Sequence, residues 1–229
     1  MKKKLPAVVV LCFAAAAAFQ LLSYFGARAL LAVLPERVPF DMTTVLDRMI
    51  PLSPPWILVY FGAYASWIAG LFLILTAGRA RAVRVTFAYM LALAVCGICF
   101  VLLPCTLVRP EIEGRGFFPE AMRFLYQADS PTNLFPSIHV LASWFCFRGM
   151  TGCPKISRAV KTVFFVLFVL VSLSTLFVKQ HVIADIPSAV FLGEACFLAS
   201  RLVRPERILH RSRQPASFIS SASEGKQTS

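Results

Sequence analysis

The segment Ser174 to Asp185 carries the residues that are best suited to chemistry. It reads STLFVKQHVIAD: an apolar run ends in Lys179, Gln180 and His181, and Asp185 follows. An aspartate four residues after a histidine lies on the same face of a helix. Its carboxylate can accept a hydrogen bond from Nδ1, which leaves Nε2 free as a base or nucleophile. The alternative is an interfacial pair in which Asp185 caps the next helix, near a proline two residues on.

A second polar cluster is NLFPSIHV, from Asn133 to Val140. Pro136 suits the first turn of a helix, and Ser137 and the next backbone N–H groups then form an anion site at the helix N-terminus. His139 follows one turn into that helix. The alternative is a helix that merely begins at a proline and buries one histidine.

A third cluster is Arg109-Pro110, at the predicted end of a long apolar run. The guanidinium of Arg109 cannot lose its charge, and its planar fork suits a phosphate. An interfacial anchor is the alternative for this residue alone. Together, Arg109, Lys179 and Ser137 can bind a phosphoryl group, and His181 and His139 can take opposite roles around it. Asp185 then orients His181.

Composition indicates the elements that must position these residues. The chain of 229 residues is 58% hydrophobic and 15% charged, with a mean hydropathy of +0.73. These values and the long charge-free runs exclude an ordinary soluble domain. We expect an all-α, polytopic membrane domain over residues 1–203 and a basic, Ser-rich, disordered tail over 204–229. The six predicted helices are Leu5–Ala27 (not cleaved as a signal peptide), Trp56–Ala77, Val85–Val108, Pro136–Phe147, Thr162–Val178 and Val182–Ser200.

The distribution of charge predicts topology. The net charge is +12, but most of the 23 Lys and Arg fall near the N-terminus, in two short loops and in the tail. This pattern is typical of cytoplasmic loops, and it argues against a nucleic-acid partner. The termini are then cytoplasmic, and the three polar clusters lie together on the outer face. Glu194 falls on roughly the opposite helix face from Asp185, so we expect it to be protonated or paired outside the site.

The three clusters resemble the motifs of the type 2 phosphatidic acid phosphatase superfamily. Arg109-Pro110, Pro136 to His139, and Ser174 to Asp185 are similar to its three motifs, and the similarity places a core at about residues 85–203. Three positions depart from the pattern: Leu102 stands for a lysine, Ile138 for a glycine and Thr175 for an arginine. The form FPSIH with KQHxxxD is similar to the inositolphosphotransferase and sphingolipid synthase branch.

The resemblance implies a metal-independent lipid phosphatase that uses no cofactor. His181 would attack phosphorus, Asp185 would orient it, and His139 would serve as acid and then as base. Arg109, Ser137 and Lys179 would hold the nonbridging oxygens. The alternatives are transfer between lipids, a catalytically dead lipid-phosphate-binding protein, and a zinc site made by His139, His181 and Asp185. The expected partners are a lipid phosphate and membrane lipids, in a bacterial inner membrane. The sequence indicates neither the lipid nor the oligomeric state.

Overall fold

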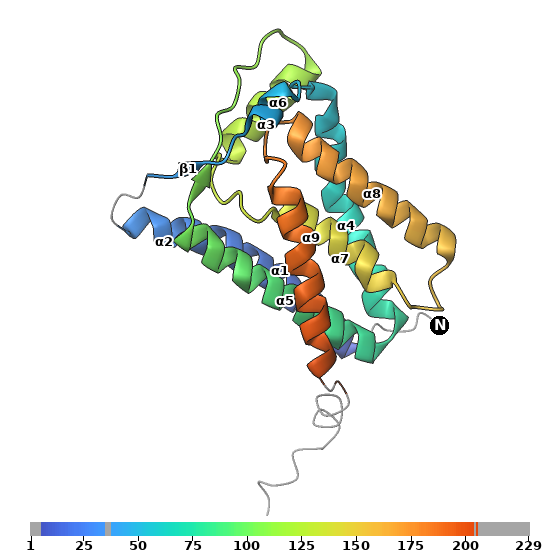
Figure 1. The fold of residues 1–229 in the computed structure, drawn as a ribbon. Helices are drawn as coiled ribbons and strands as arrows, with labels where there is room; N and C mark the ends of the chain where they lie inside the picture. Colours follow the sequence, from blue (N-terminus) through green and yellow to red (C-terminus); the bar gives the residue numbers. More distant parts are fainter. Residues whose placement is uncertain (1–5, 35–37, 204, 206–229) are drawn as a thin grey trace, which may run out of the picture.

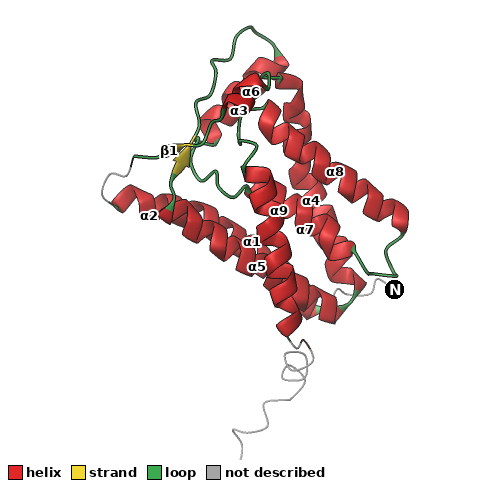
Figure 2. Cartoon of the chain, viewed as in Figure 1, coloured by secondary structure: helices red, strands yellow, loops and turns green. Residues whose placement is uncertain are grey.

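The computed structural model describes residues 6–34, 38–203 and 205, and most of them lie in helices (Figures 1 and 2). The first helix runs from α1 (Ala7–Leu21) through a π-helical turn (Leu22–Gly26) into α2 (Ala27–Val33). The other long helices are α4 (Ile57–Ala77), α5 (Arg79–Leu102), α7 (Ile138–Met150), α8 (Arg158–Phe177) and α9 (Asp185–Ala199). The predicted tail at 204–229 lies outside the described residues, apart from residue 205.

Short elements lie in the connections. These are α3 (Val45–Met49), α6 (Phe117–Ala128), the 3-10 turns Pro54–Trp56 and Ser200–Leu202, and two short strands, β1 (Phe40–Asp41) and β2 (Cys105–Thr106). The strands pair in parallel, with Phe40 opposite Cys105. Figure 1 shows α3, α6 and β1 at one end of the bundle, where α9 begins, while the last turns of α9 lie at the other end. The connections that carry α3, α6 and the two strands therefore lie at one end of the bundle, whereas the chain passes from α4 to α5 and from α7 to α8 at the other end.

Four helices are long and apolar enough to cross a membrane: Ala7–Val33, Pro54–Ala77, Arg79–Leu102 and Arg158–Phe177. They indicate a membrane location. Helices α7 and α9 have 13 and 15 residues. At 1.5 Å per residue they are about 20 and 22 Å long, which is less than the roughly 30 Å of a hydrocarbon core.

The chain between α4 and α5 differs from the expected basic loop. Residues 79–84 belong to α5, and Arg81 donates hydrogen bonds to the carbonyl oxygens of Gly149 and Thr151 at 2.7 and 3.1 Å. Arginine is a good helix former, and its long side chain can leave an apolar environment from the end of a helix. The predicted start at Val85 was therefore wrong. The predicted end at Val108 was also late, because Pro104 cannot continue the helix that ends at Leu102.

Tight contact between α4 and α7 depends on a glycine. A Cβ atom at Gly70 would lie 2.7 Å from Sγ of Cys146 and 2.8 Å from a ring carbon of Phe164 on α8. Such a contact is closer than packed atoms tolerate, so a side chain here forces the helices apart.

We expect Gly70→Ala to destabilise the protein by about 1–3 kcal/mol through overpacking. Thermal unfolding of the purified protein in detergent measures the effect. Gly62→Ala, on the same helix, is the matched control because nothing lies within 4 Å of its added methyl group. Equal unfolding temperatures for the two variants would contradict the close packing.

Candidate active site

His181 and Asp185 form a buried pair at the start of α9. Nδ1 of His181 lies 2.9 Å from Oδ2 of Asp185, and the side chains are 6% and 0% exposed. The same oxygen accepts a hydrogen bond from the backbone N–H of Val182 at 3.1 Å. His181 lies in a turn, and Asp185 is the first residue of α9. The contact forms because this turn folds back over the helix start, and not because both residues share a helix face.

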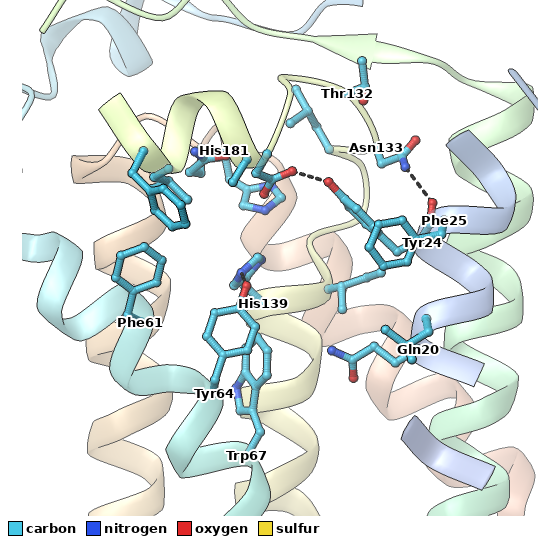
Figure 3. Close-up of a pocket in the computed structure, with 18 residues that line it drawn as sticks. Gln20, Tyr24, Phe25, Phe61, Tyr64, Trp67, Thr132, Asn133, His139 and His181 are labelled. Atoms are coloured by element: carbon cyan, nitrogen blue, oxygen red, sulfur yellow. Dashed lines mark hydrogen bonds between the residues drawn. The ribbon is translucent and has the colours of Figure 1, made fainter. Parts of the chain in front are cut away.

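His139 lies in the first turn of α7 and faces the same space as His181 (Figure 3). The centroids of the two imidazole rings are 5.7 Å apart. The ring of Tyr60 stacks on His139 at 4.5 Å, and Trp67 lies at 5.3 Å. The hydroxyl of Tyr64 is 3.4 Å from Nε2. Aromatic rings of α4 thus fix the orientation of His139.

A cavity of about 460 Å³ contains both imidazoles. Aromatic side chains from the first helix, α4 and α6 line it: Tyr24, Phe25, Phe61, Tyr64, Trp67 and Phe124. Figure 3 shows Tyr24 and Phe25 across the cavity from Tyr64 and Trp67. Apart from the histidines, Asp129 is the charged residue among its described lining, and Tyr24 donates a hydrogen bond to its carboxylate.

Ser137 takes a local structural position. It is fully buried and caps α7, and its Oγ accepts a hydrogen bond from the backbone N–H of Val140 at 3.3 Å. Because α7 begins at Ile138, Pro136 precedes the helix and does not occupy its first turn, where the sequence had placed it. The peptide bond between Phe135 and Pro136 is cis. Ser137 does not line the cavity.

Arg109 approaches the cavity but does not line it. Nη1 donates to the backbone oxygen of Asp129 at 2.6 Å, and Nη2 donates to Oε1 of Gln180 at 2.6 Å. The guanidinium carbon lies 4.6 Å from the centroid of the Tyr126 ring. Burial lowers the pKa of Arg109, and the charge of Asp129 opposes this change. The guanidinium remains charged. Its contact with the cavity is indirect, because it binds Gln180, which lines the cavity.

Lys179 turns away from the two imidazoles. Nζ donates to the backbone oxygens of Asp47 and Ile50 at 2.8 and 2.5 Å, and the residue has a left-handed φ of 54°. It lines a second cavity of about 610 Å³, which Arg48 and His181 also line. His181 therefore lies between two cavities. The hydrogen bonds of Lys179 connect the turn that contains His181 to α3 and the residue after it.

The structure adds two residues that sequence reasoning missed. Gln180 lines the first cavity, is 2% exposed, and has a buried Nε2 with no hydrogen-bond partner in the described part of the chain. Asp47 accepts from the backbone N–H of Ile183 at 2.7 Å and from that of Thr44 at 2.8 Å. The position of Gln180 next to His181 was an available signal. Nothing in the sequence links Asp47 to a turn that begins more than 130 residues later.

We expect Asp47→Ala to destabilise the protein by about 1–3 kcal/mol at neutral pH, because the backbone N–H of Ile183 loses its acceptor. Burial acts to raise the pKa of Asp47, but hydrogen bonds from Thr44 and Ile183 and the charge of Lys179 lower it overall. The ionised carboxylate therefore stabilises the fold above the unfolded pKa of roughly 3.9, and this stability is lost as the pH falls through the lower folded pKa.

Unfolding temperatures of the purified protein between pH 2 and 7 test this prediction. Asp41→Ala is the control because Asp41 is exposed and bonds locally to the backbone of Thr43. An Asp47→Ala variant with the wild-type unfolding temperature at pH 7 and the wild-type loss of stability in acid would contradict it.

Two further expectations concern charged and metal-binding groups. Glu194 is paired, as the sequence suggested: its Oε1 accepts from Arg148 Nε at 2.6 Å and from Trp144 Nε1 at 3.1 Å, outside the cavity of the histidines. Within the described ranges, no three His, Cys, Asp or Glu side chains gather in a way that could hold a metal ion.

Comparisons of the chain with protein-family models, with curated proteins and with solved structures gave no match.

Proposed function

We propose that the protein is a membrane-embedded phosphatase that acts on a lipid phosphate or diphosphate through a phosphohistidine at His181. One observation carries this proposal. A histidine whose Nδ1 is held by the buried carboxylate of Asp185 shares a cavity with a second histidine, His139, at a centroid distance of 5.7 Å. A two-step transfer needs a nucleophile and a separate acid–base group, and the two imidazoles supply both.

In the first step, Nε2 of His181 attacks phosphorus, and the bond from phosphorus to the leaving oxygen breaks. The leaving oxygen takes a proton from His139. Asp185 accepts the hydrogen bond from Nδ1 and stabilises the positive charge that develops on His181. In the second step, neutral His139 removes a proton from water. The water oxygen bonds to phosphorus, the P–N bond breaks, and inorganic phosphate leaves.

The nonbridging oxygens need donors while charge shifts onto them. Arg109, Ser137 and Lys179 are the donors that the motif resemblance assigns. In the resting structure Arg109 and Lys179 bond to protein oxygens, and Ser137 caps α7. We add Gln180 to this set, because its Nε2 has no hydrogen-bond partner among the described residues and its Oε1 accepts a hydrogen bond from Arg109.

The membrane arrangement is part of the proposal. In this proposal the shorter helices α7 and α9 complete a six-helix bundle with the four longer ones. Helix α7 packs against α4, α5 and α8, and α9 packs against α5 and α7. The distribution of Lys and Arg favours cytoplasmic termini and an extracytoplasmic site, in a bacterial inner membrane.

The test is phosphate release by the purified protein in detergent. A panel of lipid phosphates and diphosphates is offered with EDTA present, and His181→Ala and His139→Ala serve as controls. Release that both substitutions abolish supports a metal-independent lipid phosphatase. Wild-type release by His181→Ala would overturn the phosphohistidine mechanism.

Transfer between lipids is the second candidate, and the size of the cavity favours it. About 460 Å³ leaves room for an acceptor alcohol beside a phosphoryl group. A labelled lipid phosphate, incubated with a second lipid alcohol, separates the two reactions. Label in a new lipid indicates transfer, and label in inorganic phosphate indicates hydrolysis.

A further inference from the structure

Helix α3 has two unlike faces, and the apolar one is exposed. Val45, Leu46 and Met49 are 77%, 63% and 74% exposed, whereas Asp47 is 5% exposed. At 3.6 residues per turn, the three apolar side chains fall within an arc of about 100°, and Asp47 lies outside that arc. Large apolar side chains gathered on one exposed face mark a surface that binds an apolar partner.

The opposite face of α3 binds the turn that contains His181. The carboxylate of Asp47 accepts a hydrogen bond from the backbone N–H of Ile183 at 2.7 Å. Nζ of Lys179 donates to the backbone oxygen of Asp47 at 2.8 Å. These polar contacts fix the orientation of α3 on the protein, so its apolar face points away from the turn.

Helix α3 lies at the level where two membrane-spanning helices have their ends. The backbone N–H of Ser53, four residues after α3, donates to the carbonyl oxygen of Phe177, the last residue of α8, at 3.0 Å. The Phe177 ring stacks on Trp56, near the start of the span Pro54–Ala77, at 4.8 Å. Tryptophan is enriched at the boundary between hydrocarbon and water. Figure 1 shows α3 at the end of the bundle where α4 begins and α8 ends.

The exposed apolar surface continues beyond α3. Val38 and Phe40, which precede α3, are also exposed. Phe40 pairs with Cys105, three residues after the span Arg79–Leu102 ends. Exposed apolar side chains therefore occur at the ends of three spans. A bilayer meets every span at this level, whereas a protein partner would cover one local patch, so the distribution favours lipid.

We propose that the apolar face of α3 inserts into the interfacial region of the membrane that the long helices cross, where lipid acyl chains cover Val45, Leu46 and Met49. Amphipathic helices lie in the plane of the interface in this way. Arg48 is exposed on the same helix and can extend its guanidinium to lipid phosphates. The membrane then holds α3 on one side, and α3 holds the turn of His181 on the other.

Photocrosslinking in a bilayer tests the insertion. Benzoyl-phenylalanine replaces Leu46 in the full-length protein, or Glu113 in the control. Glu113 is exposed in the connection between β2 and α6, which extends past α6 in Figure 1. The proteins are reconstituted in vesicles of phosphatidylethanolamine and phosphatidylglycerol, irradiated and analysed by mass spectrometry. We expect the probe at Leu46 to give about tenfold more lipid adduct than the probe at Glu113, because acyl chains surround an inserted face.

The same probe at Met49 is an independent second position and should give the same excess of lipid adduct. Equal lipid labelling from Leu46, Met49 and Glu113, or adducts to a second protein chain in place of lipid, overturns the inference. The inference goes beyond the proposed function and depends only on the membrane location. Because the measurement involves no turnover, a protein without phosphatase activity would still show the insertion, and an active phosphatase without lipid adducts at α3 would contradict the insertion alone.

Discussion

His181→Ala should lower phosphate release by about four orders of magnitude or more, because a transfer that uses a covalent intermediate cannot proceed without its nucleophile. The position is well suited to that role. The ring is held through Nδ1, and its other nitrogen is left for chemistry. Added imidazole should restore part of the activity of His181→Ala, because the small molecule can occupy the space of the missing ring.

His139→Ala should lose about 10²–10⁴-fold, which is the usual contribution of a general acid–base group. With a substrate whose leaving group needs no proton, His139→Ala should still form the phosphohistidine and hydrolyse it slowly. Rapid quenching with ³²P-labelled substrate should then trap label on His139→Ala and none on His181→Ala. Label on His181→Ala, or loss of the folded state in either variant's thermal unfolding, would contradict this assignment of roles.

Asp185 gives the second large effect. Asp185→Asn should lower turnover by about 10²–10⁴-fold, because an amide cannot stabilise the positive imidazole and can reverse the tautomer. Asp185→Ala should also destabilise the fold by several kcal/mol. It removes the acceptor of both His181 Nδ1 and the Val182 N–H, and each buried donor left without a partner costs about 1–3 kcal/mol.

Comparison of the two variants separates orientation from stability. Asparagine keeps an acceptor oxygen, so Asp185→Asn should unfold at a temperature closer to that of the wild type than Asp185→Ala does. Unfolding in detergent and phosphate release together measure the difference. A fully active Asp185→Asn would show that the carboxylate only caps α9, which is the alternative that the sequence left open.

The sequence predicted well those features that depend on local pattern. The bounds of α4 differ from the predicted helix by one residue, because prolines before it and Gly78 after it mark both ends. The amphipathic helix α6 was missed. Its surroundings read as a polar connection, and it is held by burial of Met122 and Leu125 against other elements. Tertiary contacts of this kind leave little trace in a short segment.

The candidate site divides in the same way. The spacing from His181 to Asp185 is local, and the two residues do meet. The directions of Lys179 and Arg109 depend on backbone carbonyls from distant segments, so their positive charge alone could not show where the side chains point. Gln180 became a candidate only when the fold placed it beside both histidines around one cavity.

The tie between Asp47 and the turn of His181 also sets an order on assembly. Asp47 and Ile183 are 136 residues apart in the chain. During synthesis, α3 therefore leaves the ribosome long before the segment that contains Ile183 has been made. Until then, the Asp47 carboxylate accepts hydrogen bonds only within the local capping box with Thr44. The proposed site therefore needs the finished chain: a nascent chain that stops before α9 carries both His139 and His181, but it lacks Asp185, whose carboxylate holds Nδ1 of His181.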